Sequence, residues 1–296
     1  LTVEEDAVRI KDLGSSNGTF CDNVRIVEAF LGPNDVVRIG DSALRLSVFR
    51  GTRPVPKPVL DPTGGLIGTG REMQRLFDLV EKAARHDFPM ALYGEPGAGK
   101  SAVIRALSSL GGRAQGPLVE IDCASQDWEE LERKLFGFVR GDTPETLRSD
   151  AGAFEKAQGG ALVLDRVDET SMFIQHRLLE VLDHGRVRPV GSPTGFDMDC
   201  RLFATARQPL RGRVVEGRFS QHLFEHIAQL EIVVPPLRDR LEDLPALVTH
   251  FLGVHAFEWK GEMSTPRMTV EALRRLSSHS WPGNLKELST VVRDAI

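Results

Sequence analysis

The chain has 296 residues, of which 41% are hydrophobic and 27% are charged, and its formal net charge is −5. This length favours two domains, one of them large enough to bury a core of its own. The acidic balance argues against a DNA-binding surface, so any DNA contact would need a module outside this chain. No apolar run predicts a membrane span, and three widely spaced cysteines without a metal-binding pattern suit a cytoplasmic location.

The first 50 residues consist of short runs in which apolar and polar side chains alternate between clusters of turn residues. The runs 8–11, 36–39 and 44–48 have the period of two that predicts short β-strands. Residues 51–64 contain four prolines and predict a linker between this β-region and the rest of the chain.

From residue 65 onward, apolar runs that predict strands alternate with segments of helical spacing. This alternation predicts a parallel sheet covered by helices, followed by a small helical lid beyond Pro235 and Pro236. Within the lid, Thr269 and Asn284 are expected to be N-caps of two helices. The predicted strands are 89–93, 117–122, 161–165 and 201–205, and the predicted helices include 102–110, 128–136 and 171–183.

Residues 94–101 have the sequence Gly-Glu-Pro-Gly-Ala-Gly-Lys-Ser, between a predicted strand and a predicted helix. This is the setting of a phosphate-binding loop, in which backbone N–H groups receive phosphate oxygens. We expect Lys100 to reach the β- and γ-phosphates of ATP and Ser101 to ligate Mg²⁺. The alternative is a glycine-rich turn that binds nothing. The expected nucleotide-binding residues of the loop are Gly94, Glu95, Pro96, Gly97, Ala98, Gly99, Lys100 and Ser101.

The apolar strand predicted at 161–165 ends in an acid, Asp165. A strand of this kind fits the second phosphate-site motif of P-loop proteins, whose aspartate holds Mg²⁺ through water. Asp165 and Ser101 are therefore the predicted Mg²⁺ site. The alternative is a buried strand that happens to end in Asp.

Several short motifs occur in a fixed order along residues 65–296. At this spacing they resemble the AAA+ domain of sigma-54-dependent bacterial transcription activators. The resemblance implies an ATP-binding ring, commonly a hexamer, that hydrolyses ATP to remodel sigma-54 RNA polymerase. It also implies a core at 65–236, a lid at 237–296 and a nucleotide-sensing lid position, which Lys286 occupies here. The motifs are LIGTG at 66–70, the phosphate loop, LFG at 135–137, GAFEKAQGG at 152–160, LD at 164–165, PPLRDRLEDLP at 235–245 and WPGNLKEL at 281–288.

The N-terminal region carries a second resemblance. Through the stretches 12–20 and 36–41, residues 7–49 resemble the C-terminal part of a forkhead-associated (FHA) domain, a family that recognises phosphothreonine peptides. The resemblance implies that Ser16 and Asn17 contact the peptide. The Gly-Arg pair and the Ser-x-x-His motif of the family are not in this chain, so we expect a partial FHA sandwich at 1–50. The alternative for the stretch around Ser16 is an ordinary hairpin turn.

The loop that contacts sigma-54 differs from the family pattern. The family sequence is GAFTGA, which aligns here with residues 141–146. Thr143 replaces the aromatic residue and Pro144 replaces the essential threonine, and a proline cannot donate a backbone hydrogen bond. We therefore do not expect this loop to engage sigma-54 in the family manner.

Positions that the family uses for hydrolysis also differ. Arg166 follows Asp165 where the family has the glutamate that polarises the attacking water, and Glu169 could replace that acid only if the strand end curls. Further replacements concern hydrolysis as well. Asp122 replaces the asparagine that positions this glutamate, and Arg207 replaces the asparagine that senses the γ-phosphate. Ser220 and His226 replace two arginines that act on the ATP of the neighbouring subunit.

The predicted fold is thus an α/β P-loop AAA+ core with a small all-helical lid, preceded by a partial all-β FHA sandwich. The predicted function is an ATP-binding regulatory switch with little turnover, whose partners are ATP or ADP, further copies of the chain in a ring, and a phosphothreonine protein at the FHA part. One alternative is an active oligomeric ATPase that activates sigma-54-dependent transcription, with Arg166, Arg207, Lys286 and Glu169 forming an unusual working site. A second alternative is a phosphothreonine-peptide adaptor.

Overall fold

The chain forms two units, Leu1–Val55 and Pro56–Ile296. The finer domain boundaries predicted above, at residues 64 and 236, stay predictions. Within the part of the chain that the structure describes, no helix is long and apolar enough to span a bilayer. The computed structural model describes residues 2–4, 7–12, 19–21, 24–31, 36–39, 42–45, 66–124, 127–140, 148–260 and 269–295.

The first unit is all-β, as its alternating pattern predicts. It holds a three-stranded sheet of order β1-β2-β5 and a four-stranded sheet of order β4-β3-β6-β7, and every strand pair is antiparallel. Ile10 and Val37, one from each sheet, are buried together. The strands are β1 (Thr2–Glu4), β2 (Ala7–Lys11), β3 (Thr19–Cys21), β4 (Val24–Ile26), β5 (Glu28–Leu31), β6 (Val36–Ile39) and β7 (Ser42–Arg45).

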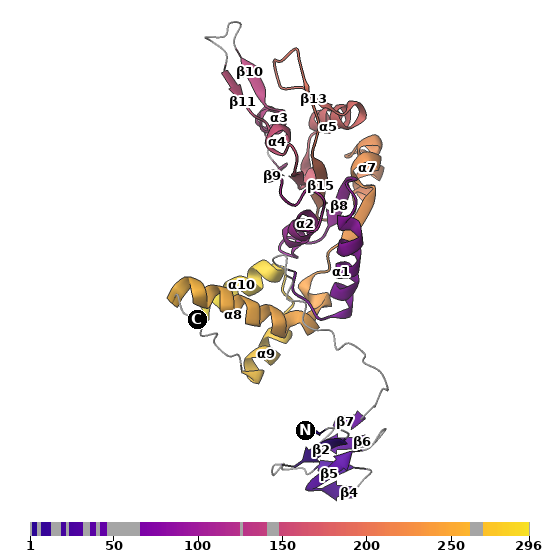
Figure 1. Cartoon of the computed structure of the whole chain (residues 1–296), viewed down its shortest axis with the longest axis vertical. Helices are drawn as coiled ribbons and strands as arrows, with labels where there is room; N and C mark the ends of the chain where they lie inside the picture. The colour runs from indigo at the N-terminus through magenta and orange to yellow at the C-terminus, as the bar shows by residue number, and fades with distance from the viewer. Residues whose placement is uncertain are drawn as a thin grey trace. The chain divides into compact units, whose positions relative to one another are not determined.

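The second unit is built on a five-stranded parallel sheet of order β16-β8-β15-β12-β9. Strands β8, β9 and β15 of this sheet are labelled in Figure 1. The four strands expected from the sequence all lie in it. Because the strands are parallel, their carboxyl ends meet at one edge of the sheet, which is where ligands bind in open α/β folds. The strands are β8 (Met90–Tyr93), β9 (Leu118–Asp122), β12 (Ala161–Asp165), β15 (Arg201–Ala206) and β16 (Leu230–Val233).

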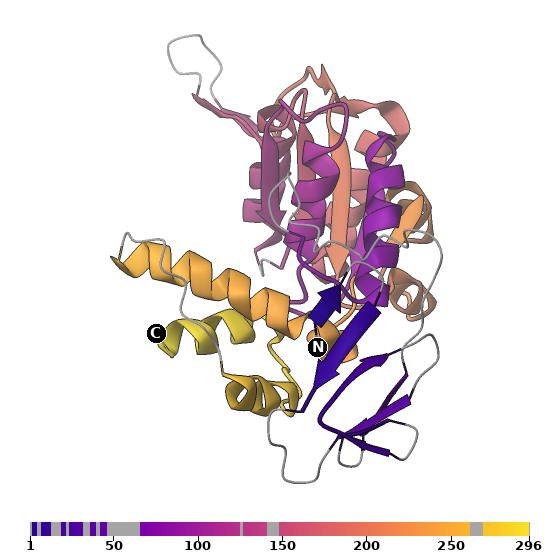
Figure 2. The same cartoon turned by 60° about the horizontal axis from the view of Figure 1, so that its bottom comes forward.

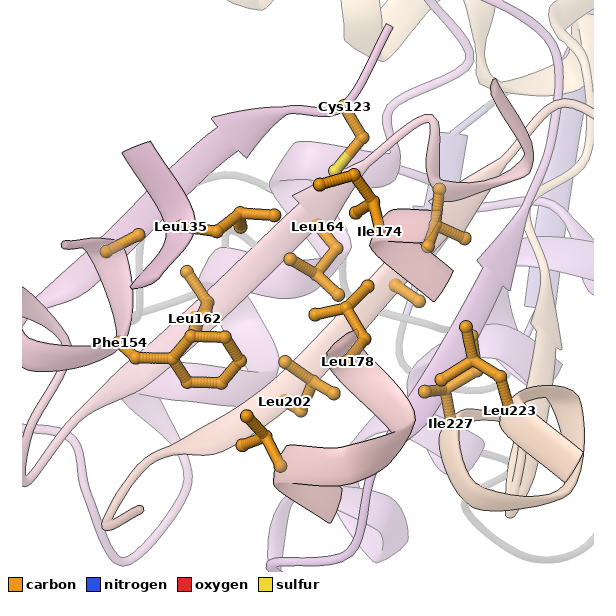
Figure 3. Close-up of a cluster of buried hydrophobic side chains, with 14 of the residues drawn as sticks. Cys123, Leu135, Phe154, Leu162, Leu164, Ile174, Leu178, Leu202, Leu223 and Ile227 are labelled. Carbon is orange, nitrogen blue, oxygen red and sulfur yellow. The ribbon is translucent and has the colours of Figure 1, made fainter. Parts of the chain in front are cut away.

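Alternate residues of each central strand enter two separate cores. In β12, Leu162 and Leu164 pack into the core covered by α3, α5 and α7, while Ala161 and Val163 pack into the core covered by α1 and α2. Figure 3 shows the first core, where Leu178 of α5 lies against these strand residues. The helices are α1 (Arg71–Ala84), α2 (Lys100–Ser109), α3 (Trp128–Phe136), α5 (Met172–His184) and α7 (Gln221–Ile227).

The lid consists of three helices that gather at one end of the sheet in both views (Figures 1 and 2). They enclose a third apolar cluster around Trp281, which is 2% exposed. Thr269 is the expected N-cap, since its hydroxyl accepts the N–H of Ala272. The lid helices are α8 (Leu244–Lys260), α9 (Val270–Ser277) and α10 (Asn284–Asp294), and the remaining elements are β10 (Phe138–Arg140), β11 (Arg148–Asp150), α4 (Ala153–Lys156), η1 (Val167–Glu169), β13 (Arg186–Val187), β14 (Phe196–Asp197), α6 (Leu210–Val215), η2 (Leu237–Asp239) and η3 (Leu241–Asp243).

Candidate functional site

The phosphate loop joins the end of β8 to the start of α2. Gly97 and Gly99 have φ angles of 76° and 110°, in the left-handed region that favours glycine. A Cβ atom on Gly97 would also lie 2.4 Å from the carbonyl oxygen of Gly283. Glycine at 97 therefore lets the lid approach the loop closely, beside the helix start where free N–H groups can receive an anion.

Lys100, the first residue of α2, folds its side chain back over the loop. Its ammonium group donates hydrogen bonds to the carbonyl oxygens of Gly94 (2.7 Å) and Glu95 (3.2 Å). Burial lowers the pKa of Lys100, and the charge of nearby Asp165 opposes this shift. A partly buried ammonium group held by neutral carbonyl oxygens would gain stability from a phosphate group in the same place.

Asp165 ends β12 and lines the same cavity as the loop, and a hydrogen bond orients its carboxylate. The hydroxyl of Thr205, on β15, donates to Oδ1 of Asp165. The same hydroxyl accepts the N–H of Arg166 at 3.1 Å. One oxygen of Asp165 is thus used for positioning, and the other lies 3.9 Å from Nε of Arg166.

Arg166 forms an ion pair with Asp122, which ends the adjacent strand β9. The backbone of Arg166 is left-handed, with φ of 56°, and turns the chain from β12 into η1. Partial burial would raise the pKa of Asp122, but hydrogen bonds from the Ala124 N–H and from Arg166 outweigh it and lower this pKa. The residue after Asp165 is therefore a cation already engaged by a carboxylate.

A cavity of about 1240 Å³ lies between the loop, the strand ends and the lid. Its lining includes apolar side chains such as Ile67, Leu247 and Phe251. The lining is also strongly positive, because the described lining residues include seven lysines or arginines and a single acid, Asp165. A cavity of this kind suits a polyanion that carries an apolar group. The seven cationic residues are Lys100, Arg105, Arg166, Arg207, Arg240, Lys286 and Arg293.

Glu95 links the loop to the lid. Its carboxylate accepts two hydrogen bonds from Arg238 (2.8 and 2.7 Å) and one from Nδ2 of Asn284 (3.1 Å). Arg238 first, and then Asn284, lower the pKa of Glu95 to about 2. The predicted nucleotide-binding residue Glu95 thus has a clear second role, as a contact between core and lid.

The expectation that Asn284 is an N-cap is wrong. Asn284 is the first residue of α10 with φ of 55°, and Gly283 precedes the helix without a side-chain cap. Its amide instead accepts the N–H of Leu237 (2.8 Å) and donates to the carbonyl oxygen of Pro96 (3.1 Å). The side chain is fully buried because it connects three distant segments.

Arg240 and Asp243 support the site, and sequence reasoning gave neither of them a role. Arg240 is 2% exposed and donates to the carbonyl oxygen of Ala98 at 2.6 Å. Asp243 accepts the N–H groups of Thr69 (2.5 Å) and Gly70 (2.6 Å) at the start of α1. Both belong to the motif at 235–245. The sequence therefore marked them as part of a family motif, but it did not indicate which residues they contact.

The other predicted positions lie apart from the cavity or outside the described residues. Ser220 caps its own helix by accepting the N–H of Leu223, and His226 lies 2.9 Å from a carboxylate oxygen of Asp183. Neither lines the cavity, and Glu169 does not line it either. Ser16, Asn17, Thr143 and Pro144 lie outside the described residues. Among the described residues, no three His, Cys, Asp or Glu side chains form a metal-binding group.

Comparison with known families agrees with this architecture. Residues 66–233 match the family model described as the sigma-54 interaction domain. The chain belongs to this family. In this sigma-54 interaction domain protein, residues 238–296 also match the AAA+ ATPase lid domain and residues 1–40 match the FHA domain. The resemblance and the fold class inferred from the sequence are thereby confirmed.

Relatives of this sigma-54 interaction domain protein include transcription regulators. It is 36% identical over 228 residues to the DNA-binding transcriptional regulator NtrC of Bradyrhizobium sp. (strain RP501 Parasponia), covering 77% of this chain and 47% of that protein. Crystal structures of NtrX from Brucella abortus in complex with ATP and with ADP, each 32% identical, have TM-scores of 0.70 and 0.69. They cover 77% of this chain and 49% and 50% of NtrX. The chain spans about half the length of the curated relatives it matches.

Proposed function

We propose that this chain is an ATP-binding regulatory module of the sigma-54 activator family with little ATP turnover. The observation that carries the proposal is the cavity, whose lining combines residues of the phosphate loop, seven cationic residues and several apolar side chains. The NtrX structures with ATP and with ADP support the same ligand class. In this proposal residues 94–101 hold the phosphates, Lys100 contacts the β- and γ-phosphates, and Lys286 closes the site from the lid.

Magnesium fits the donors available in the site. Ser101 offers an exposed hydroxyl at the start of α2, and Asp165 has one carboxylate oxygen that Thr205 does not occupy. Mg²⁺ prefers oxygen ligands and keeps several waters, so one hydroxyl, one carboxylate and the nucleotide's phosphates suffice. The ion would supply charge neutralisation for the phosphates. Ser101 would ligate it directly, and Asp165 would hold it through water.

Slow turnover follows from the groups around the third phosphate. The position directly after Asp165 holds Arg166 instead of an acid, and the nearby Asp122 carboxylate is paired with that arginine. Ser220 and His226 engage local partners instead of offering free cations. Loss of an arginine finger alone costs about 10³–10⁵ in rate in P-loop enzymes. The regulatory effect of this module would then come from nucleotide-dependent assembly into a ring or from partner binding. The FHA part would recognise a phosphothreonine protein, and this chain would make no contact with DNA.

An active ATPase that drives sigma-54-dependent transcription is the second candidate, and the family match over 66–233 favours it. One experiment separates the two. ATP binding and ATP hydrolysis would be measured on the same purified sample over a range of protein concentrations. Tight Mg²⁺-dependent binding without turnover at any concentration supports the regulatory module, whereas turnover that rises with concentration supports the ATPase.

A further inference from the structure

The pair formed by Arg166 and Asp122 stands at the edge of the proposed nucleotide site and is accessible to solvent. The Arg166 side chain is 34% exposed and the Asp122 side chain is 58% exposed. Arg166 also lines the cavity, so its guanidinium can reach an anion there as well as the carboxylate of Asp122. An exposed ion pair has a small net free energy, about 1 kcal/mol or less, and a stronger anion can displace one partner.

The backbone of each partner is fixed, so exchange needs only side-chain rotation. The N–H of Arg166 is bonded to the Thr205 hydroxyl at 3.1 Å, and this anchors its left-handed backbone at the strand end. Oδ1 of Asp122 accepts the N–H of Ala124 at 3.0 Å, while Oδ2 receives Arg166. Asp122 therefore keeps a hydrogen bond and solvent contact when Arg166 leaves.

The third phosphate of ATP would bring an anion to this edge that competes with Asp122 for Arg166. Lys100 marks the β- and γ-phosphate positions. Arg207, at the end of β15, lies close enough to Lys100 to lower the pKa of its ammonium group, although burial is the larger cause. Asp165, Arg166 and Arg207, all at strand ends, line the same cavity as Lys100. In the proposed site they would therefore face the third phosphate of ATP, a group that ADP does not have.

We propose that Arg166 exchanges the Asp122 carboxylate for the terminal phosphate of ATP, so that a single chain distinguishes ATP from ADP. The proposal rests on the nucleotide site proposed above. Guanidinium–phosphate hydrogen bonds are charge-assisted and can be bidentate, which favours the phosphate over an exposed carboxylate. ATP would release Asp122 at the end of β9, next to α3, and ADP would leave the pair intact. The two nucleotides would then give two different surfaces without hydrolysis.

The test is the ratio of the ADP and ATP dissociation constants, measured by isothermal titration calorimetry on residues 1–296 with Mg²⁺. Arg166→Gln should raise the dissociation constant of ATP about tenfold and leave that of ADP unchanged, because only ATP carries the group that Arg166 contacts. Asp122→Asn should lower the dissociation constant of ATP several-fold, because Arg166 no longer has to leave a carboxylate to reach the phosphate. Arg105→Gln, at another arginine of the cavity, controls for general charge and should change both constants by the same factor.

An unchanged ratio in Arg166→Gln and Asp122→Asn would overturn the proposal, and so would equal losses of ATP and ADP in Arg166→Gln. If Arg166→Gln does not fold, as judged by its thermal unfolding, Asp122→Asn decides alone, with an unchanged ratio counting against the proposal. A wild-type chain that binds ATP and ADP equally would refute this inference while leaving the nucleotide site standing. A wild-type chain that binds neither nucleotide would refute both.

Discussion

The phosphate-loop region and helix α7, with its cap Ser220, both lie where the sequence resemblance predicts residues that handle ATP, yet their side chains behave differently. In the loop, Lys100 lies over carbonyl oxygens at the mouth of a large positive cavity. In α7, Ser220 caps its own helix and His226 lies against Asp183 of α5. Residues of the loop line a space that a ligand can fill, whereas Ser220 and His226 are engaged by a backbone N–H and by a carboxylate of α5. This contrast is what we expect if the chain binds ATP but hydrolyses it slowly, as proposed above.

The largest effect is expected at the loop. Lys100→Ala should abolish the nucleotide-dependent rise in stability, which for the wild type amounts to about 2.7 kcal/mol at a hundred times the dissociation constant. Thermal unfolding with and without ATP·Mg²⁺ measures it. Lys156→Ala, on α4 and outside the cavity, is the matched control and should keep the full rise. A rise that survives in Lys100→Ala would show that the loop does not bind the phosphates.

A slightly smaller effect is expected at the contact between loop and lid. Asn284→Ala removes the acceptor for the buried Leu237 N–H and the donor to Pro96, so it should lower the free energy of unfolding by about 2 kcal/mol. Denaturant titration measures this. Asn284→Gly removes the same side chain but tolerates the φ of 55°, and it separates lost hydrogen bonds from backbone strain. Wild-type stability in both variants would mean that the contact contributes nothing.

Asn284 also shows where sequence reasoning stops. The sheet strands, the loop and helices such as α3 follow from local patterns, so the sequence predicts them within a residue or two. The partners of Asn284 are Glu95, Pro96 and Leu237, and a polar residue at a helix start is equally compatible with a local cap. Sequence distance hides such contacts, since nothing in either segment alone specifies the other.

The same limit applies to the ionic contacts. Arg166 and Asp122 each stand out in the sequence as departures from the family, but only the register that sets Asp165 beside Asp122 reveals them as a pair. Arg240 and Asp243 belong to a recognisable motif, yet their contacts lie at Ala98 and Gly70, far away in the chain. Motif reasoning finds such residues, and the fold assigns their partners.

A change at Arg166 tests whether the hydrolytic side can be restored. Arg166→Glu replaces a cation by an acid that can orient water, and at saturating ATP it should raise turnover by about tenfold, below the 10²–10⁴ of a complete general base. The gain stays partial because Ser220 and His226 supply no permanent cation. Arg166→Gln removes the charge without adding an acid and is the control. Equal turnover in the two variants would assign the low rate to other residues.

The smallest effect is expected from pH at the lid contact. Arg238 and Asn284 hold the pKa of Glu95 at about 2, below its ordinary value of 4.5. The ionised form is therefore stabilised by folding, and this contribution is complete above about pH 4.5 and disappears as the pH falls toward 2. The Glu95 side chain is 38% exposed, so solvent screening limits the contribution to about 1 kcal/mol or less.

Glu95→Gln should accordingly lose stability near neutral pH and show a shallower decline below about pH 4.5 than the wild type. Denaturant titrations across the acid range measure the two slopes. Glu225→Gln, on α7, is the matched control: its carboxylate accepts a hydrogen bond from Gln221 of the same helix, and its curve should run parallel to that of the wild type. Parallel curves for all three proteins would mean that Glu95 and Arg238 do not couple the loop to the lid. The contact would then rest on other bonds, such as those of Asn284 and the hydrogen bond from the Leu285 N–H to the carbonyl oxygen of Gly97.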